Sequence, residues 1–492
     1  MVLNARFYFF SKESLIISMI FIGTNLIAQE TLVLSLNDCV QKGLDYNYGV
    51  RQARNNTIAS RSDNIAAFGA MLPQINANSG NFWNAGLTVD PVTNIIARVP
   101  LSSANAGLGF STILFDGFQT MNSWRQAKVN TLIAKYDLDN TLNTVALNTA
   151  SQYLSVLMAK EVLKVANEQL KVTDIGVSRL RKLNAAGAIS PNELLQMEAQ
   201  LARDEQRHLT AENSLGLSKL ILAQGIGMKT NMFVISEIGL NELMEQPRII
   251  RIRPEAIFAS SMDIQPNVKA AQLRIESADF GLKATIAQRM PRLTMNGQIS
   301  TSYSDQAIDI IYSDLQAIEI GYWLNSSGDN VSVYHPVEVR VPLGVESKTL
   351  ETQLSENVRQ YVGLNLSVPI FNGFQISNAI KRAKIGRMNA ELQYEQEVDN
   401  FEQTVERSHA DATSAWKQYI AAQKTVDASY KAFVDATIRR QEGTLTVYDY
   451  SSVQNTYLAA VSDALSAKYD AQFKAYILKF YMKSPLKSVQ EN

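Results

Sequence analysis

The sequence contains one segment twice, and the segment changes its hydrophobic period in the middle. GLGFSTILFDGFQTMNSWRQAK begins at Gly107, and GLNLSVPIFNGFQISNAIKRAK begins at Gly363, 256 residues later. Ten of the 22 positions are identical. In the second copy, apolar residues first alternate with small or polar ones, which is the period of a strand with two unlike faces. The alternation stops at Phe-Asn-Gly-Phe, so we expect a strand that leads into a helix, twice in one chain.

The runs that follow the two segments predict very long helices, at 118–183 and 374–440. Neither run contains a proline, and Gly176 and Gly386 are their only internal glycines. At ~1.5 Å per residue each helix would be on the order of 100 Å long, far beyond the average of three or four turns. Helices of this length must pack lengthwise against other helices.

A glycine-centred turn and a returning helix are predicted after each long helix. Ser190-Pro191-Asn192-Glu193 combines a capping hydroxyl, a proline at the first helical position and an acid at the third, which is a strong helix start. Gly187 and Gly443 mark the two turns and are again 256 residues apart. Loops vary freely in length between related segments, whereas the two long helices have equal lengths. Equal helix lengths suggest that both turns must reach the same plane.

The two halves share one order of elements: helix, strand, loop, strand, long helix, turn, helix. We expect the first helix to run without a break from Ser35 to about Met71, and a loop of roughly fifty-five residues to follow Tyr303. The predicted strands are 74–82, 106–115, 292–303 and 362–370, and the predicted return helices are 190–224 and 447–483. The predicted organisation is a first repeat at 29–224, a linker at 225–262 with short elements, a second repeat at 263–483 and a tail at 484–492.

The N-terminal 28 residues read as a secretory signal peptide. Arg6 and Lys12 precede a short apolar run, and Ala28 is a small residue at a plausible cleavage point. A single anchoring helix is the alternative.

Cys39 is the only cysteine, so no disulfide framework is possible. Bulky Asn and Asp precede it where a lipoprotein cleavage site needs small residues, so we interpret Cys39 as a helix residue.

Composition limits how the chain can meet its surroundings. The net charge of −1 gives no indication of a nucleic-acid partner. After the N-terminus no stretch reaches the roughly 18 consecutive apolar residues of a spanning helix. Only helices and closed barrels satisfy their backbone groups in lipid, so a membrane-embedded form would be a barrel.

Signals for catalysis are poor. The three histidines are far apart, and no phosphate loop, serine elbow or cysteine pair occurs. We interpret acidic clusters such as Asp204 and Glu205 as exposed helix faces or as salt links between the long helices. An enzyme, a cofactor and a metal site are therefore not expected.

The four strands indicate a shared barrel. The smallest membrane barrels have about eight strands, so one chain cannot close one, whereas three chains would supply twelve. Aromatic residues lie near the strand ends, where interfacial belts occur. An ordinary β-sandwich is the alternative for the strands, but it leaves the long helices unexplained.

The sequence resembles the TolC-type outer-membrane efflux family over nearly the whole mature chain. The resemblance rests on the opening LSLNDCVQKGL, the helix-ending LP and MP, the doubled FDGFQ and FNGFQ, and the turn motifs GAISPNELL and GTLTVYDY. It implies a mixed α and β membrane protein: a homotrimer with a 12-stranded outer-membrane β-barrel that continues as a long periplasmic α-helical barrel, with the linker at 225–262 in an equatorial belt. It also implies an exit duct of a tripartite efflux or type I secretion system, with a periplasmic adaptor and an inner-membrane transporter as partners and outer-membrane lipid around the barrel.

The resemblance also assigns candidate site residues. Asp449 matches the first of two acidic positions that narrow the entrance in this family, whereas the second falls on Ser452, and Glu193 is the equivalent in the first repeat. First-turn acids that complement the helix dipole are the alternative for these positions. The predicted adaptor-contacting turns comprise Gly187, Ala188, Ile189, Ser190, Gly443, Thr444, Leu445 and Thr446. The predicted junction between barrel strand and tunnel helix comprises Phe115, Gly117, Phe118, Phe371, Gly373 and Phe374.

Two other classes of function remain open at this stage. A non-conducting structural or adhesive coiled coil with a membrane foot would require strict heptads, which the Ala- and Asn-bearing stripes do not clearly provide. An exported enzyme is the third class. Drugs, metals, polysaccharides and proteins all remain open as cargo.

Overall fold

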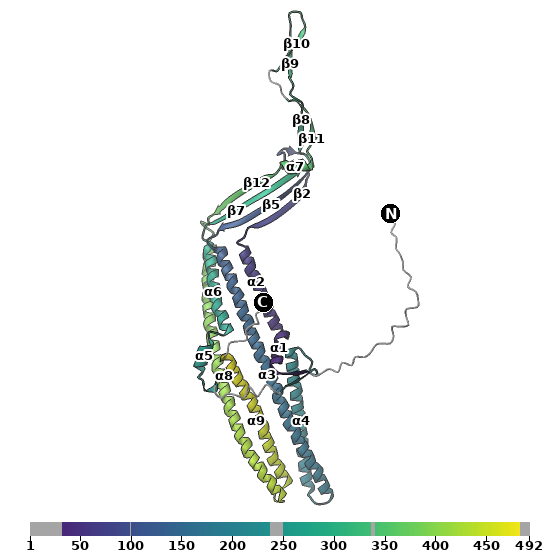
Figure 1. Ribbon diagram of the computed structural model, residues 1–492, viewed down its shortest axis with the longest axis vertical. Coiled ribbons are helices and arrows are strands. Elements are labelled where there is room, and N and C mark those ends of the chain that lie inside the picture. The colour runs from purple at the N-terminus through teal and green to yellow at the C-terminus, as the bar shows by residue number, and fades with distance from the viewer. Residues whose placement is uncertain (1–31, 99, 237–248, 336–339, 483–492) are drawn as a thin grey trace, which may run out of the picture. The chain divides into compact units, whose positions relative to one another are not determined.

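The computed structural model describes residues 32–98, 100–236, 249–335 and 340–482 (Figure 1). The predicted signal peptide and the predicted tail lie outside these residues, as does part of the predicted linker. The chain divides into two compact units, and each takes segments from both sequence repeats. The helical unit comprises Met1–Arg51, Thr141–Ser261 and Thr404–Asn492, and the sheet unit comprises Gln52–Asn140 and Met262–Gln403.

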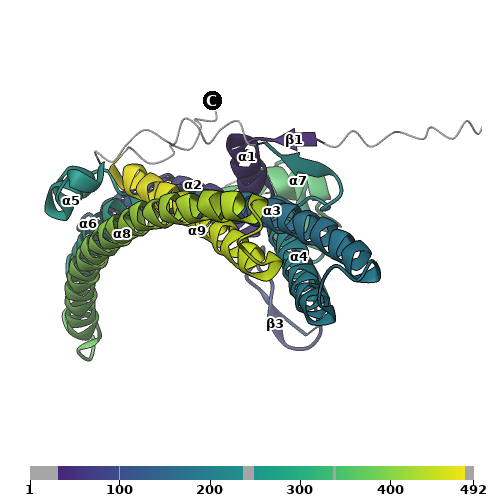
Figure 2. The same cartoon turned by 90° about the horizontal axis from the view of Figure 1, so that it is seen from below.

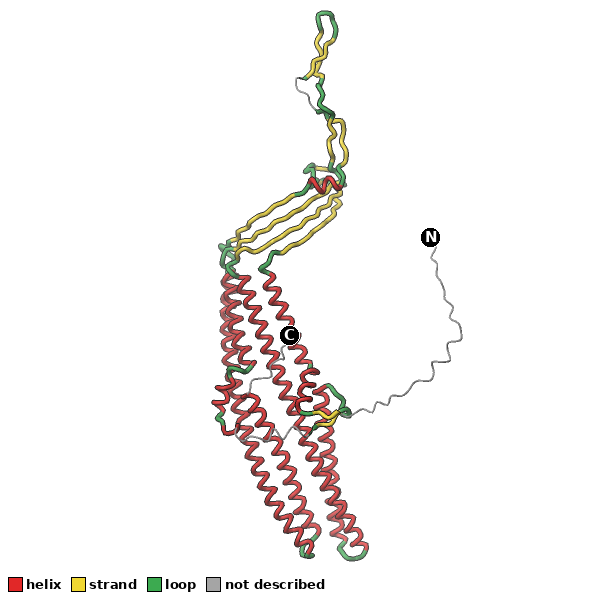
Figure 3. The backbone as a smooth tube through the Cα atoms, in the orientation of Figure 1, coloured by secondary structure: helices red, strands yellow, loops and turns green. Residues whose placement is uncertain are grey.

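The four predicted strands form one antiparallel sheet in the sheet unit, in the order β12-β7-β5-β2 (Figure 3). β5 begins five residues before the predicted strand, and β12 ends three residues early, because Pro369 cannot donate a ladder hydrogen bond. β2 and β12 are the two edges of the sheet. The bounds are β2 (Gln74–Asn84), β5 (Leu101–Phe115), β7 (Arg292–Ser304) and β12 (Arg359–Ser367).

The long helices and their return helices have equal lengths in the two repeats. α3 (Gln119–Ala185) and α8 (Gln375–Gln441) have 67 residues each. α4 (Pro191–Ile226) and α9 (Val447–Met482) have 36 each. Within the helical unit, α3 runs beside α4 and α8 beside α9 (Figures 1 and 2). None of the helices in the described ranges is both long and apolar enough to cross a membrane.

The first helix is broken, so the prediction of one continuous helix was wrong. α1 (Leu36–Tyr46) and α2 (Tyr48–Gly69) are separated by Asn47, whose backbone is extended. The Asn47 side-chain oxygen accepts the backbone N–H groups of Gly49, at 2.8 Å, and Val50, at 3.3 Å. Asparagine is a strong N-cap, so its local hydrogen bonds end one helix and start the next.

Small elements complete the helical unit. β1 (Leu32–Leu34) pairs in parallel with β6 (Phe233–Ile235), which confirms a short strand in the predicted linker. The linker also contains 3-10 helix η2 (Ile249–Arg251) and α5 (Pro254–Ser261). β1, β6, α1, α3 and α4 share a core that includes Leu34, Cys39, Tyr153, Leu157, Leu222 and Phe233.

Cys39 is fully buried in that core and belongs to α1, which confirms its interpretation as a helix residue. Burial in apolar surroundings penalises the charged thiolate and raises the pKa of Cys39 to about 12. The thiol is therefore a small core hydrophobe.

In the sheet unit, α6 (Pro266–Ala287) and α2 flank the first part of α3. Ser277 on α6 donates to Asn130 at 2.6 Å, and Thr131 donates to the Ser60 carbonyl at 3.0 Å. These bonds tie α6 and α2 to opposite sides of the segment that leads out of β5.

The connection between β7 and β12 is not a plain loop. It forms two ribbons, β8 (Ile308–Tyr312) with β11 (Pro342–Ser347) and β9 (Glu319–Leu324) with β10 (Asn330–Tyr334), and helix α7 (Leu350–Glu356). A further small pair, β3 (Thr88–Val89) and β4 (Ile96–Ala97), lies after β2. Every residue of β8 to β11 is exposed, so no single buried face imposed an alternating pattern that sequence analysis could detect.

Candidate functional site

The four-stranded sheet has one polar and one apolar face. Residues that pair directly across an antiparallel ladder share a face, so the register defines both surfaces. The apolar face includes Ile75, Leu108, Phe110, Leu293, Met295, Ile299, Val362, Leu364 and Leu366. The polar face includes Asn76, Asn78, Ser103, Asn105, Asn296, Gln298, Ser300, Ser302 and Asn365. The sheet therefore presents two chemically different surfaces.

Each strand-to-helix junction uses two consecutive left-handed residues. Gly117 and Phe118 both have φ of 67°, and Gly373 and Phe374 have φ of 60° and 62°. Glycine accepts this conformation without cost, whereas phenylalanine is strained in it. The doubled motif therefore encodes a doubled backbone conformation that turns a strand into a helix.

The phenylalanines of each junction contact one another edge to face. The ring centroids of Phe115 and Phe118 lie 5.8 Å apart, and those of Phe371 and Phe374 lie 5.6 Å apart. Such contacts contribute about 0.5–1.5 kcal/mol beyond burial. They partly offset the backbone strain of the second phenylalanine in each motif.

The two helical turns also repeat one geometry. The N–H of Ala188 donates to the Leu183 carbonyl and that of Gly187 to Asn184, both at 2.9 Å, around Gly187 with φ of 71°. The second turn has the same pair of bonds, from Thr444 to Arg439 and from Gly443 to Arg440, with φ of 76° at Gly443. This is a Schellman ending followed at once by a new capped helix.

The two turns meet through a small apolar cluster in the helical unit. Val447, at the start of α9, packs with Val177, Leu180 and Met197 of α3 and α4. Ile189 is partly buried against the same cluster, whereas Gly187, Ala188, Ser190, Gly443, Thr444 and Thr446 are exposed. The exposed turn residues form one end surface that contains both repeats.

The candidate entrance acids both lie in the first turn of a helix. Asp449 is exposed, and its carboxylate accepts the Thr446 hydroxyl at 2.8 Å while its N–H donates to Thr446 Oγ1 at 3.1 Å. Glu193 is half-buried in the first turn of α4, and Ser452 is exposed one turn beyond Asp449. Helix capping accounts for the orientation of Asp449 within one chain.

A comparison with protein families decides what these features belong to. The model described as "Outer membrane efflux protein" matches residues 40–228 and 263–479, which is most of both repeats. The chain belongs to the outer membrane efflux protein family. It is therefore an outer-membrane protein, and its mixed α and β architecture with an internal repeat is the family fold, as the sequence resemblance predicted.

Relatives and solved structures agree with this assignment. The outer membrane efflux protein BepC of Brucella suis is 19% identical over 475 residues, with 95% of this chain and 89% of BepC covered. A solved structure of CusC has a TM-score of 0.71 at 15% identity, and the match covers 92% of this chain and 94% of that one. The open-state MtrE outer membrane channel of Neisseria gonorrhoeae has a TM-score of 0.69 at 17% identity, over 92% and 90% of the two chains.

Asp204 lies in a buried polar cluster of the helical unit. Asp204 is only 1% exposed, so the exposed-face alternative was wrong for it, although its neighbour Glu205 is exposed. Its ion pair with Arg207, at 3.4 Å, lies within α4 and does not link two helices. Its carboxylate accepts hydrogen bonds from Thr173 at 2.7 Å and Gln200 at 3.0 Å. It also accepts one from Gln169, which bonds to Asn455 as well. The cluster joins α3, α4 and α9.

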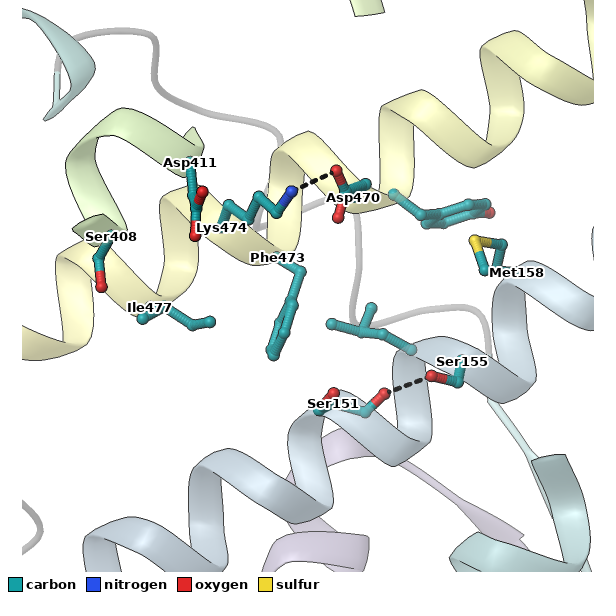
Figure 4. A pocket seen from close by; sticks show the side chains of 11 residues that line it. Ser151, Ser155, Met158, Ser408, Asp411, Asp470, Phe473, Lys474 and Ile477 are labelled. Atoms are coloured by element: carbon teal, nitrogen blue, oxygen red, sulfur yellow. Dashed lines mark hydrogen bonds and ion pairs between the residues drawn. The ribbon is translucent and has the colours of Figure 1, made fainter. Parts of the chain in front are cut away.

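A groove of about 290 Å³ lies among α3, α8 and α9 in the helical unit (Figure 4). Lys474 points along it and pairs with Asp470 at 2.9 Å, one turn away on the same helix. Ser155 donates to the Ser151 carbonyl at 3.0 Å. Lys474, Asp470 and Ser155 are thus engaged within their own helices.

The histidines stay apart, and each has a different environment. His409 lies 3.1 Å from the Ile250 carbonyl, His208 is half-buried on α4, and His335 is exposed. Across the described ranges, no group of three or more His, Cys, Asp and Glu is placed to hold a metal ion.

Proposed function

We propose that three copies of this chain form an outer-membrane exit duct that passively conducts solutes from a periplasmic assembly to the exterior. The observation that carries the proposal is the two-faced sheet with two free edges. In one chain, β2 and β12 each pair on one side only. An unpaired edge is unfavourable in lipid, and pairing β12 of one copy with β2 of the next removes all edges in a ring.

Three copies supply twelve strands, which is enough for a closed barrel. The face with Leu108, Ile299 and Leu364 would meet lipid, and the face with Asn105, Ser300 and Asn365 would line the water-filled interior. The exposure of both faces in one chain fits a sheet completed by lipid and neighbouring copies.

The long helices would form the periplasmic tunnel below the barrel. The four helices α3, α4, α8 and α9 of each chain would give twelve around the axis, and their matched lengths bring both turns to one plane. Phe115, Gly117 and Phe118, with Phe371, Gly373 and Phe374, would mark the periplasmic edge of the membrane, where barrel strand becomes tunnel helix.

The turns would be the docking end of the duct. Gly187 and Gly443 lie in exposed turns that a periplasmic adaptor can reach, and the adaptor would connect the duct to an inner-membrane transporter. Asp449, Glu193 and Ser452 would lie around the entrance, where three-fold symmetry brings three copies of each side chain about one axis and so narrows the opening. The duct itself would be no enzyme.

Recordings in planar bilayers test this proposal. We expect small or rare currents for the unchanged protein and larger, more frequent ones for Asp449→Ala. Asp463→Ala, which removes an exposed acid further along the same helix, is the matched control and should not change the current. Native mass spectrometry in detergent should show three chains. Absence of current in every variant would favour the non-conducting coiled coil.

A further inference from the structure

The polar face of the sheet carries charge of one sign only. The strands β2, β5, β7 and β12, all of them described, contain no Asp, Glu, Lys or His, and Arg292 and Arg359 are their only charged residues. Arg359 pairs with Ser300, and Arg292 pairs with Ser367. By the alternation of the ladder, both arginines belong to the same face as Asn296, Gln298 and Ser302.

The two arginines lie at opposite ends of this face. Ser300, the partner of Arg359, is eight residues along β7 from Arg292, which is about 27 Å of strand. That length is close to the ~25 Å height of the apolar band of an outer-membrane barrel. Both side chains are exposed, and neither forms an ion pair with a described residue.

Between the arginines the face consists of amides, hydroxyls and glycines, together with the apolar Ile113, which pairs with Thr294. Asn78, Asn105, Ser300 and Ser302 line a hollow of about 390 Å³ that Arg359 also borders. Uncharged groups of this kind can replace the water around a passing solute without favouring either sign of charge. Any discrimination by charge within the barrel therefore depends on the two arginines.

We propose that Arg359 and Arg292 form two cationic rings, one at each end of an otherwise uncharged barrel interior, and that the barrel favours anionic over cationic solutes. The inference rests on the proposed function, because it requires three copies with the polar face inward. Rings of arginine are a known basis of anion preference in pores, since they lower the energy of an anion in a confined, poorly screened space.

Several acids just beyond the strands engage groups other than the two arginines. Asp309 and Glu356, in the connection between β7 and β12, both flank Lys348, at 3.6 and 2.6 Å. Asp90 is buried and accepts the N–H groups of Val92 and Thr93. Asp116 accepts the N–H of Thr120 at 2.9 Å.

Reversal potentials in a KCl gradient across a planar bilayer test the inference. All proteins carry Asp449→Asn and Glu193→Gln, because carboxylates at the entrance would add a cation preference of their own. The test variants are Arg359→Gln, Arg292→Gln and the double variant, and Arg359→Lys preserves the charge. Arg387→Gln is the matched control, because Arg387 lies on α8 and pairs with Glu391 one turn away, at 2.9 Å.

We expect a chloride preference in the parent that falls several-fold in the double variant and persists in Arg359→Lys and Arg387→Gln. The difference should shrink in 1 M salt, where the screening length is about 3 Å instead of about 10 Å at 0.1 M. Channels with one common selectivity in the parent and the double variant would overturn the inference while leaving the duct intact. An equal shift in Arg387→Gln would also overturn it. No current in any variant would instead reject the duct itself.

Discussion

The two strand-to-helix junctions have the same backbone but different surroundings. A Cβ on Gly117 would lie 2.5 Å from the Cβ of Met290 and 3.0 Å from the Ala287 carbonyl, at the end of α6. A Cβ on Gly373 would meet nothing within 4 Å. The first junction is therefore packed inside one chain, and the second faces open space.

The sequence repeat explains this difference. Met290-Pro291 ends the helix before β7, and Leu72-Pro73 ends the corresponding helix region before β2. β5 pairs with β7, so its junction meets the end of α6 within the chain. β12 and β2 are the opposite edges, so in the proposed ring the second junction would meet Leu72 of a neighbouring copy. We expect the first junction to govern folding of the chain and the second to govern assembly.

Gly117→Val should have the largest effect. The substitution places a β-branched side chain at positive φ, and that side chain clashes with the Met290 side chain and the Ala287 carbonyl. Together these effects should lower the free energy of unfolding by about 3 kcal/mol or more. Thermal unfolding in detergent, followed by helical circular dichroism, measures it. Gly386→Val is the control, because Gly386 has open space around it on α8. A melting temperature equal to that of the control would contradict the packed junction.

Gly373→Val should have a smaller effect on the chain and a clear one on assembly. Within one copy, only the backbone strain at positive φ destabilises the fold, by roughly 1–2 kcal/mol. In the ring the added methyl groups would press against the neighbouring copy. Native mass spectrometry should show fewer trimers, whereas Gly373→Asn should preserve them because asparagine tolerates this conformation. Unchanged trimer and unchanged export for Gly373→Val would refute the assignment.

The residue before each junction glycine offers a third comparison. Asp116 caps α3 through the N–H of Thr120, and its loss in Asp116→Ala should cost about 1 kcal/mol. Asn372→Ala, the matched change in the second junction, should cost less, because Asn372 has an amide where Asp116 has a carboxylate near the helix start. Thermal unfolding of the two variants gives the difference. Equal losses would mean that the cap does not distinguish the junctions.

The aromatic contacts are the shared part of the two junctions and should show the smallest difference. Phe115→Leu and Phe371→Leu should each lower stability by about 0.5–1 kcal/mol, because the ring geometries match within one chain. The same thermal assay applies to both. A large inequality would show that one ring has a further partner in the assembled protein.

Most of the architecture could be predicted because it follows from local periodicity. The alternation around Leu364 and Leu366 predicts a strand, and the long runs after Gly117 and Gly373 predict helices whose observed bounds lie within two residues. The fixed spacing of 256 residues between the repeats also predicted that each long helix ends in an equivalent turn. These signals are read along the chain and need no knowledge of tertiary contacts.

What could not be predicted depends on contacts across the fold. The break at Asn47 was missed because one capping side chain outweighs an otherwise helical run. Asp204 was misjudged because its burial depends on Thr173 and Gln200, which approach from other turns and helices. The packing of Gly117 against Met290 was equally invisible, since the two residues are far apart in sequence. The entrance roles of Asp449 and Glu193 stay predictions, because one chain has no three-fold axis.

The two free edges of the sheet have a genetic consequence. In the proposed ring, every copy must pair its two edge strands with those of both neighbouring copies. A copy with one defective edge therefore prevents closure of any ring that it joins. In a cell that makes equal amounts of sound and defective chains, only about one ring in eight would contain three sound copies. A proline placed in the middle of β12 should therefore behave as a dominant mutation and not a recessive one, and its severity should follow the ratio of the two chains.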